Sequence, residues 1–138
     1  MTKELWINLP VKDIKRSREF FRNIGFNFNT QHPENDQSVS LVIGSKNIIV
    51  MLFREDIFKG FIQHDVTDTA VSSEMLISID AESPEEVDAI AEKVSASGGI
   101  IFGKPSAIQG WMYGCGFTDP DGHRWNVLHM DLSKMPEH

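Results

Sequence analysis

Apolar and polar residues alternate near the start of the chain. One side of this extended segment is fully apolar and consists of Leu5, Ile7, Leu9 and Val11. The other side is mixed and consists of Trp6, Asn8 and Pro10. Successive side chains of a strand point to opposite faces, so this period of two predicts a strand with one buried face.

The pattern then changes to helical spacing. Asp13 is suited to cap a helix, and Gly25 stands where a left-handed C-terminal cap would fall. Between them, apolar or small residues recur three and four positions apart at Ile14, Ser17, Phe20, Phe21 and Ile24. A short extended segment over 26–29 and a hairpin of 38–43 with 47–53 complete the unit.

The same order of elements occurs a second time. Residues 74–80 alternate, with Met75, Ile77 and Ile79 on one side and Glu74, Leu76 and Ser78 on the other. A capping box at Ser83 and Glu86, followed by an apolar stripe to Val94, predicts a helix. A short strand over 100–102 and a hairpin of 113–118 with 123–129 follow. Residues 54–73 form a connector, in which 55–62 are expected to be a short helix and 66–73 a loop.

The two units are offset by roughly 70 residues. We therefore predict an α+β fold in which two βαβββ modules form a cupped mixed sheet with the helices on its outer face. The expected single domain spans 1–138, with module one at about 3–53, the connector at 54–73 and module two at 74–131. The fully apolar strand faces should pack under the helices, and the mixed faces suit a small-molecule pocket.

Composition and charge exclude several classes of partner. The formal net charge is −7 and no run of five or more Lys or Arg occurs, which argues against nucleic acid and against an anionic membrane surface. No apolar run is long enough to span a bilayer. Cys115 is the only cysteine, and the N-terminus lacks an apolar signal core, so a cytoplasmic location is expected.

The residues that could carry chemistry each have a structural alternative. Glu74 could be a metal ligand or a general base, or a carboxylate that is solvated or paired with Arg124. Asn8 and Asn126 could bind a ligand or bond to each other across a sheet. Trp6 could stack on a flat ligand or only pack. His32 and His64 are expected at the surface of loops, and the thiol of Cys115 in the core.

Two stretches carry a resemblance to a known family. The segments INLPVKDIKRSREFFRNIGF and FTDPDGHRWNVLHMD resemble the vicinal oxygen chelate superfamily, which includes glyoxalase I, extradiol dioxygenases, and fosfomycin and bleomycin resistance proteins. The resemblance extends from about Lys3 to Asp131. Small bacterial glyoxalase-like proteins, described as predicted lactoylglutathione lyases, are the most similar group within it.

The resemblance also implies where a metal would bind. Members that hold Zn, Ni, Mn or Fe take ligands from four strands, at positions that correspond here to Trp6, Met51 (or Val50 in a shifted register), Glu74 and Asn126. Only Glu74 is a strong ligand for such an ion, whereas Trp and Met offer nothing that a hard or borderline cation prefers. The implied metal site is therefore depleted, and Glu74 is its one candidate ligand.

Two functions follow as alternatives. One is a glyoxalase-like lyase, with Glu74 as ligand or base and with Asn8 and Asn126 orienting the substrate. The other is a metal-free protein of the bleomycin-resistance type that sequesters a small molecule. Its apolar contacts would come from Trp6, Met51, Phe53, Leu76 and Leu128, and its polar anchors from Asn8, Glu74 and Asn126. The resemblance further implies a homodimer. A third alternative is an interaction module whose cavity is filled by its own side chains.

Overall fold

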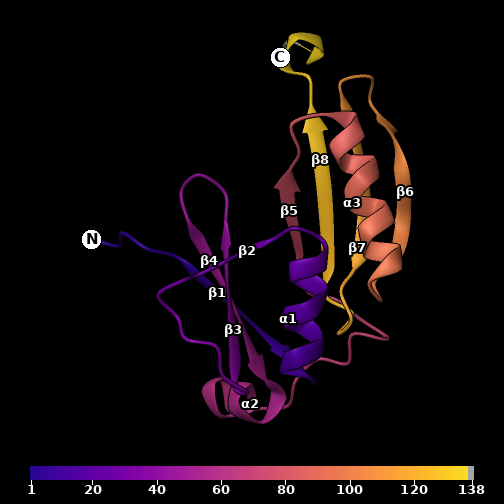
Figure 1. The fold of residues 1–138 in the computed structure, drawn as a ribbon. Coiled ribbons are helices and arrows are strands. Elements are labelled where there is room, and N and C mark those ends of the chain that lie inside the picture. Colours follow the sequence, from indigo (N-terminus) through magenta and orange to yellow (C-terminus); the bar gives the residue numbers. More distant parts are fainter. Residues whose placement is uncertain (137–138) are drawn as a thin grey trace. The chain divides into compact units, whose positions relative to one another are not determined.

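The computed structural model describes residues 1–136, so the last two residues of the predicted domain lie outside the described residues. The chain divides into two compact units, one over Met1–Ser72 and the other beginning at Ser73 (Figure 1). Each unit holds one four-stranded mixed sheet. Among the described residues, no helix has both the length and the apolar character needed to cross a membrane.

The first unit has the predicted βαβββ order. Its elements are β1 (Trp6–Val11), α1 (Ile14–Asn23), β2 (Asn27–Phe28), β3 (Ser38–Ile43) and β4 (Ile48–Arg54). The strand order is β1-β4-β3-β2, in which β1 runs parallel to β4 and the other pairs are antiparallel. The long connection through α1 allows the parallel pair, because parallel strands cannot be joined by a tight turn.

Helix α1 covers one face of this sheet. The Asp13 side chain accepts a hydrogen bond from the backbone N–H of Arg16 at 3.2 Å, which confirms the predicted cap. The aromatic rings of Phe20 and Phe21 pack edge to face at 5.1 Å and are both buried. They lie with the apolar side chains of the covered face, namely Leu9, Val11, Val39, Leu41, Val50 and Leu52.

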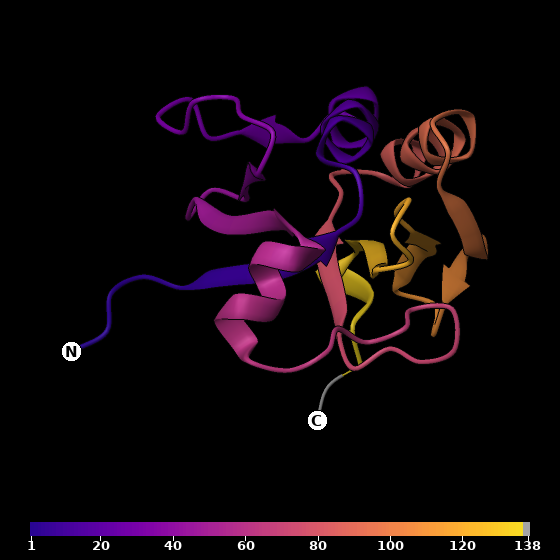
Figure 2. The same cartoon turned by 90° about the horizontal axis from the view of Figure 1, so that it is seen from below.

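A second helix, α2 (Glu55–Ile62), follows β4 directly and confirms the helix predicted in the connector. The ring of Phe61 lies edge-on to that of Phe53, with the ring centres 5.0 Å apart. Phe53 alternates with the buried Leu52 and so points away from α1. Helix α2 therefore lies on the opposite side of the sheet from α1 (Figure 2).

The second unit repeats the order. Its elements are β5 (Leu76–Asp80), α3 (Pro84–Ala96), β6 (Ile100–Ile108), β7 (Met112–Thr118), β8 (Arg124–Met130) and the short 3₁₀ helix η1 (Leu132–Lys134). The strand order is β5-β8-β7-β6, and β5 runs parallel to β8. The Ser83 hydroxyl accepts a hydrogen bond from the backbone N–H of Glu86 at 3.1 Å, as the capping box predicts. The α+β class with two βαβββ modules is thus confirmed.

Two strand boundaries differ from the sequence prediction by more than one residue. Strand β6 extends to Ile108 instead of ending at Phe102, because register shifts on either side of Gly103 absorb the glycine and Pro105 on this edge strand. Strand β5 begins at Leu76, not at Glu74. Its partner strand β8 begins at Arg124, opposite Leu76. Residues before Leu76 therefore have no residue of β8 to pair with.

Two glycines of β7 are required by close packing. A Cβ at Gly114 would stand 2.7 Å from the backbone oxygen of Val127 and 2.6 Å from Leu128 Cδ2. A Cβ at Gly116 would stand 2.5 Å from the ring of Phe102. The contact at Gly114 is with backbone and cannot be relieved by rotating a side chain.

We expect Gly114→Ala to destabilise the protein by about 2 kcal/mol, the usual cost of overpacking. Gly103→Ala is the matched control, since its nearest contact would be an ordinary 3.5 Å to the Gly116 backbone nitrogen. Urea unfolding of both variants measures the difference. Equal stability of the two variants would contradict the close packing described at Gly114.

Candidate functional site

The face of the first sheet that α1 leaves uncovered, called here the open face, carries the predicted residues of module one. Strand pairing places Asn8 opposite Met51, and Met51 opposite Ser40. The backbone N–H of Asn29 donates to the Ser40 carbonyl at 2.9 Å. Asn8, Met51, Ser40 and Asn29 therefore form one row across the strands of the sheet. Trp6 and Ile49 pair in the next row. Since directly paired residues point to the same face, these side chains lie together.

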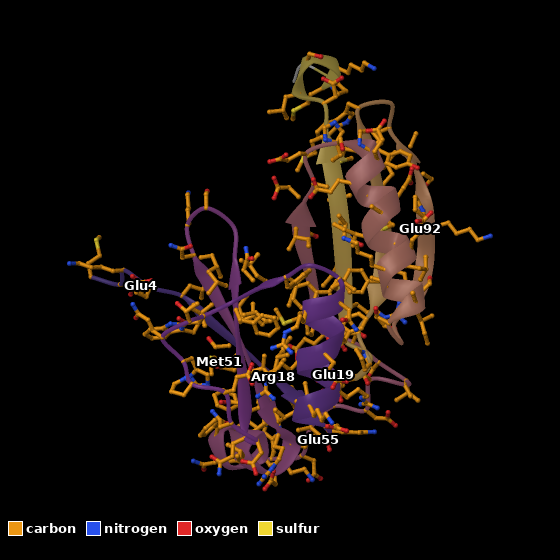
Figure 3. All side chains as sticks on the ribbon, in the orientation of Figure 1. Glu4, Arg18, Glu19, Met51, Glu55 and Glu92 are labelled. Atoms are coloured by element: carbon orange, nitrogen blue, oxygen red, sulfur yellow. The ribbon has the colours of Figure 1, made fainter. Side chains whose placement is uncertain are left out.

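The register settles one alternative that the sequence left open. Met51 shares the open face with Asn8, and its side chain is labelled in Figure 3. Val50 points the other way and is buried under α1.

A cavity of about 310 Å³ lies over this row. Its walls are formed by Trp6, Asn8, Asn29, His32, Ser40, Ile49 and Met51. Trp6 is 61% exposed although it is a large aromatic residue. The volume is at the lower end of the range for small-molecule sites.

The lining is polar at one end. The hydroxyl of Ser40 is buried and is without a hydrogen-bond partner among the described residues. The Asn29 carboxamide oxygen accepts from the backbone N–H of Gln31 at 3.1 Å. The Nε2 atom of His32 lies 2.9 Å from the Ser38 hydroxyl. The Ser40 hydroxyl and the NH₂ group of Asn29 therefore remain to bond to a ligand.

His32 is placed by the loop over 29–37. The Asn35 side chain organises this loop: its oxygen accepts from the backbone N–H groups of Gln37 and Ser38 at 2.8 and 2.9 Å, and its NH₂ lies 3.4 Å from His32 Nε2. Helix α1 anchors the same loop, because Arg18 donates to the Asn35 carbonyl and Arg22 pairs with Glu34 at 2.9 Å. Arg18 is labelled in Figure 3.

Sequence reasoning missed several lining residues. His32 was expected at the surface, but it is half-buried and borders the cavity. Ser40 could have been found, since the serines at 38 and 40 alternate with Val39 and Leu41 in the predicted strand. Asn29 lies just beyond the two-residue strand β2, and nothing in the sequence marks it.

Phe53 shares the open face but does not line the cavity. It lies one row beyond Asn8 and Met51, opposite Pro10 and Ser38. Its ring packs against Phe61 of α2 instead. Its predicted contact with a ligand stays a prediction.

Three further predicted residues share one face of the second sheet. Strand pairing places Leu76 opposite Arg124, Ser78 opposite Asn126, and Asp80 opposite Leu128. The guanidinium of Arg124 stacks over the Phe102 ring, 4.5 Å from its centre, and this ring covers Gly116. The Phe102 and Arg124 side chains thus lie over part of this face, and the third functional alternative stays a prediction. The predicted ligand contacts of Leu76, Asn126 and Leu128 stay predictions.

Glu74 lies in a bend before β5 and is exposed. Within the described part of the chain it forms no ion pair, and Arg124 stacks on Phe102. Its suggested roles as ligand or base stay predictions.

The residues implied as metal ligands do not fit a divalent ion. The indole of Trp6 has no lone pair to offer, the thioether of Met51 is a soft donor, and Asn126 supplies only a carbonyl oxygen. Over residues 1–136, no three His, Cys, Asp or Glu side chains gather closely enough to hold a metal. We therefore assign no step of the chemistry to one.

A buried carboxylate holds the turn that leads into β8. The Asp119 side chain accepts from the backbone N–H groups of Asp121 and His123 at 3.0 and 3.1 Å, and from the Trp125 indole at 3.2 Å. Burial raises the pKa of Asp119 to about 6, against the opposing effects of His123 and the bond from Trp125. This carboxylate fixes the start of the strand that carries Asn126.

Comparisons with known proteins agree with this architecture. A family model described as bleomycin resistance protein-like N-terminal matches residues 3–43. A solved structure of a hypothetical protein from S. aureus is 32% identical, with a TM-score of 0.82, over 94% of this chain and 95% of that chain. No curated protein matches the chain.

Two more distant structures share the fold. A glyoxalase-related enzyme from Fulvimarina pelagi is 18% identical, with a TM-score of 0.79, over 94% of this chain and 88% of that one. A glyoxalase/bleomycin resistance protein/dioxygenase family enzyme from Burkholderia phytofirmans is 16% identical, with a TM-score of 0.75, over 91% and 96%. The chain therefore has the fold of these glyoxalase-related and bleomycin resistance proteins, and its N-terminal part matches the bleomycin resistance protein-like family model.

The raised pKa of Asp119 predicts a pH dependence of stability. The folded state binds a proton more tightly than the unfolded state, whose carboxyl has a pKa near 3.8, so this group's contribution is largest at low pH and is lost as the pH rises through about 6. Lowering the pH from 7.5 to 5 should stabilise the wild type by about 1 kcal/mol relative to Asp119→Asn.

Urea unfolding at both pH values checks this expectation. The exposed Asp80 of β5 supplies the control, Asp80→Asn, which should change with pH as the wild type does. If the free energies of unfolding of the wild type and Asp119→Asn differ by the same amount at both pH values, the expected pH dependence is contradicted.

Proposed function

We propose that this protein binds a small organic molecule on the open face of the first sheet and that binding needs no metal ion. The observation that carries the proposal is the exposed indole of Trp6 beside a cavity that also contains the unpartnered hydroxyl of Ser40. An aromatic surface next to unsatisfied polar groups is the usual composition of a ligand site.

The cavity lining supports binding over catalysis. Glyoxalase-like lyase chemistry needs a Lewis acid and a carboxylate base. None of the seven lining residues is acidic. The lining thus offers stacking surface and hydrogen bonds, which is what a sequestering protein of the bleomycin-resistance type needs.

Elemental analysis together with ligand binding tests the proposal. The purified, untagged protein should hold far less than one Zn, Ni, Mn, Fe or Co per chain, and nitrobenzene derivatives should quench its tryptophan fluorescence equally with and without a chelator. Trp6→Ala should lose most of this quenching, because the ring that contacts the ligand is gone. Trp111→Phe, outside the cavity lining, is the control and should keep it. Near-stoichiometric metal, with binding abolished by the chelator, would move the assignment to a metal-dependent lyase.

We also propose a cytoplasmic homodimer, on the family resemblance and the reducing compartment that a single cysteine suits. Light scattering after size exclusion should give about twice the 15.6 kDa mass of one chain. A mass of one chain at every concentration from about 1 to 100 μM, which covers ordinary dimer affinities, would refute the dimer.

A further inference from the structure

The cavity on the open face has two chemically different ends. Trp6, Ile49 and Met51 supply a flat and apolar surface, beside which Asn8 supplies one amide group. Ser40, Asn29 and His32 supply polar atoms, and each comes from a different part of the sheet or its loop. A ligand that uses both ends must itself be flat and apolar at one end and polar at the other.

Ser40 is the most informative of the polar residues. It is only 4% exposed, it lies in the middle of the row between Met51 and Asn29, and its hydroxyl is without a partner among the described residues. A buried hydroxyl that makes no hydrogen bond destabilises the folded protein. Alanine would fill the same place without that cost, so the hydroxyl is better explained by a partner that binds in the cavity.

The neighbouring groups at this end are hydrogen-bond donors. The Asn29 oxygen is already engaged by the Gln31 N–H, which leaves the NH₂ group of Asn29 to donate. The Asn35 NH₂ group lies 3.4 Å from His32 Nε2 and can only donate to it, whereas the Ser38 hydroxyl, 2.9 Å from Nε2, also donates to the Asn35 side-chain oxygen at 3.4 Å. An accepting Nε2 puts the ring proton of His32 on Nδ1, which becomes a third donor.

The charge of the cavity lining limits the class of ligand further. None of the seven lining residues is Asp, Glu, Lys or Arg. An ammonium group on a ligand would face hydrogen-bond donors and would find no negatively charged side chain in the lining. A carboxylate group on a ligand would lose water of hydration and would find no positively charged side chain there. A neutral oxygen acceptor matches the three donors best.

We propose that the site selects flat aromatic carbonyl compounds, whose carbonyl oxygen is received by Ser40, Asn29 and His32 while the ring system lies against Trp6. This assignment rests on the proposed function, because it names the ligand class of the same cavity. It gives Ser40 a role in specificity that is maintained at a cost in stability, a common relation between binding sites and the fold that carries them.

Four naphthalene probes of nearly equal size test the assignment by titration calorimetry in the presence of a chelator. They are 2-acetylnaphthalene, 2-ethylnaphthalene, 1-(2-naphthyl)ethylamine and 2-naphthoate. The wild type should bind the ketone about tenfold more tightly than the hydrocarbon, which corresponds to 1.4 kcal/mol. It should bind the ammonium and the carboxylate more weakly than the ketone.

The variants separate specificity from folding. Ser40→Ala should reduce the preference for the ketone to about threefold or less, while its melting temperature rises by about 3 °C as the unpaired hydroxyl is removed. Ser95→Ala, on the exposed surface of α3, is the matched control and should keep the preference of the wild type. Trp6→Ala should weaken the ketone and the hydrocarbon by similar factors.

The outcomes distinguish the two proposals. Binding of no probe would overturn the proposed function, and the ligand class with it. Equal binding of ketone and hydrocarbon, both weakened by Trp6→Ala, would leave the proposed function standing and overturn the carbonyl assignment. A preference that survives Ser40→Ala, or a Ser40→Ala variant that is less stable than the wild type, would show that Ser40 has a structural role instead.

Discussion

The parallel pairing of β1 with β4 determines what each face of the first sheet contains. Because side chains alternate, the register that places Leu9 beside Leu52 under α1 also places Asn8 beside Met51 on the open face. A slip of one residue would bring Val50 into the site and bury a polar side chain beneath the helix. The packing of Phe20 and Phe21 against the covered face thus protects the geometry of the cavity, although neither ring contacts it.

The two sheets share one topology, but different side chains lie on the faces that their helices α1 and α3 leave uncovered. In the second sheet, glycines at 114 and 116 admit Leu128 and Phe102 over the backbone, and Arg124 stacks on the Phe102 ring. In the first sheet, the corresponding face holds a cavity with an exposed indole and an unpartnered hydroxyl. An exposed aromatic side chain and a buried hydroxyl without a partner both cost stability, so the presence of Trp6 and Ser40 in one cavity is best explained by ligand binding. On the second sheet, the Phe102 ring and the Arg124 guanidinium lie over only part of this face, since Leu76, Ser78 and Asp80 of β5 are exposed.

The sequence was most informative where one local rule decides the structure. Alternation, helical spacing and capping residues identified β1, α1, α3 and the helix over Glu55–Ile62, and alternation placed Trp6 and Asn8 on one face, whereas the choice between Met51 and Val50 needed the register of β4. Local sequence patterns did not predict positions that depend on contacts with residues far away in the chain. The position of His32 depends on Asn35 and on arginines of α1, which no local pattern links to it. The length of β6 depends on bulges that accommodate Gly103 and Pro105, residues that read as the end of a strand. Glu74 lies outside β5 because β8 offers it no partner.

The function proposed for this protein depends on a small molecule that binds to the open face of the first sheet without a metal. The most direct test is to titrate chelator-treated, ¹⁵N-labelled protein with 2-acetylnaphthalene and to follow the backbone amide resonances. We expect saturable shifts centred on Asn8, Asn29, Ser40 and Met51, which line the cavity. Shifts that spare these residues, or that arise only after a divalent metal is added, would contradict the proposed function.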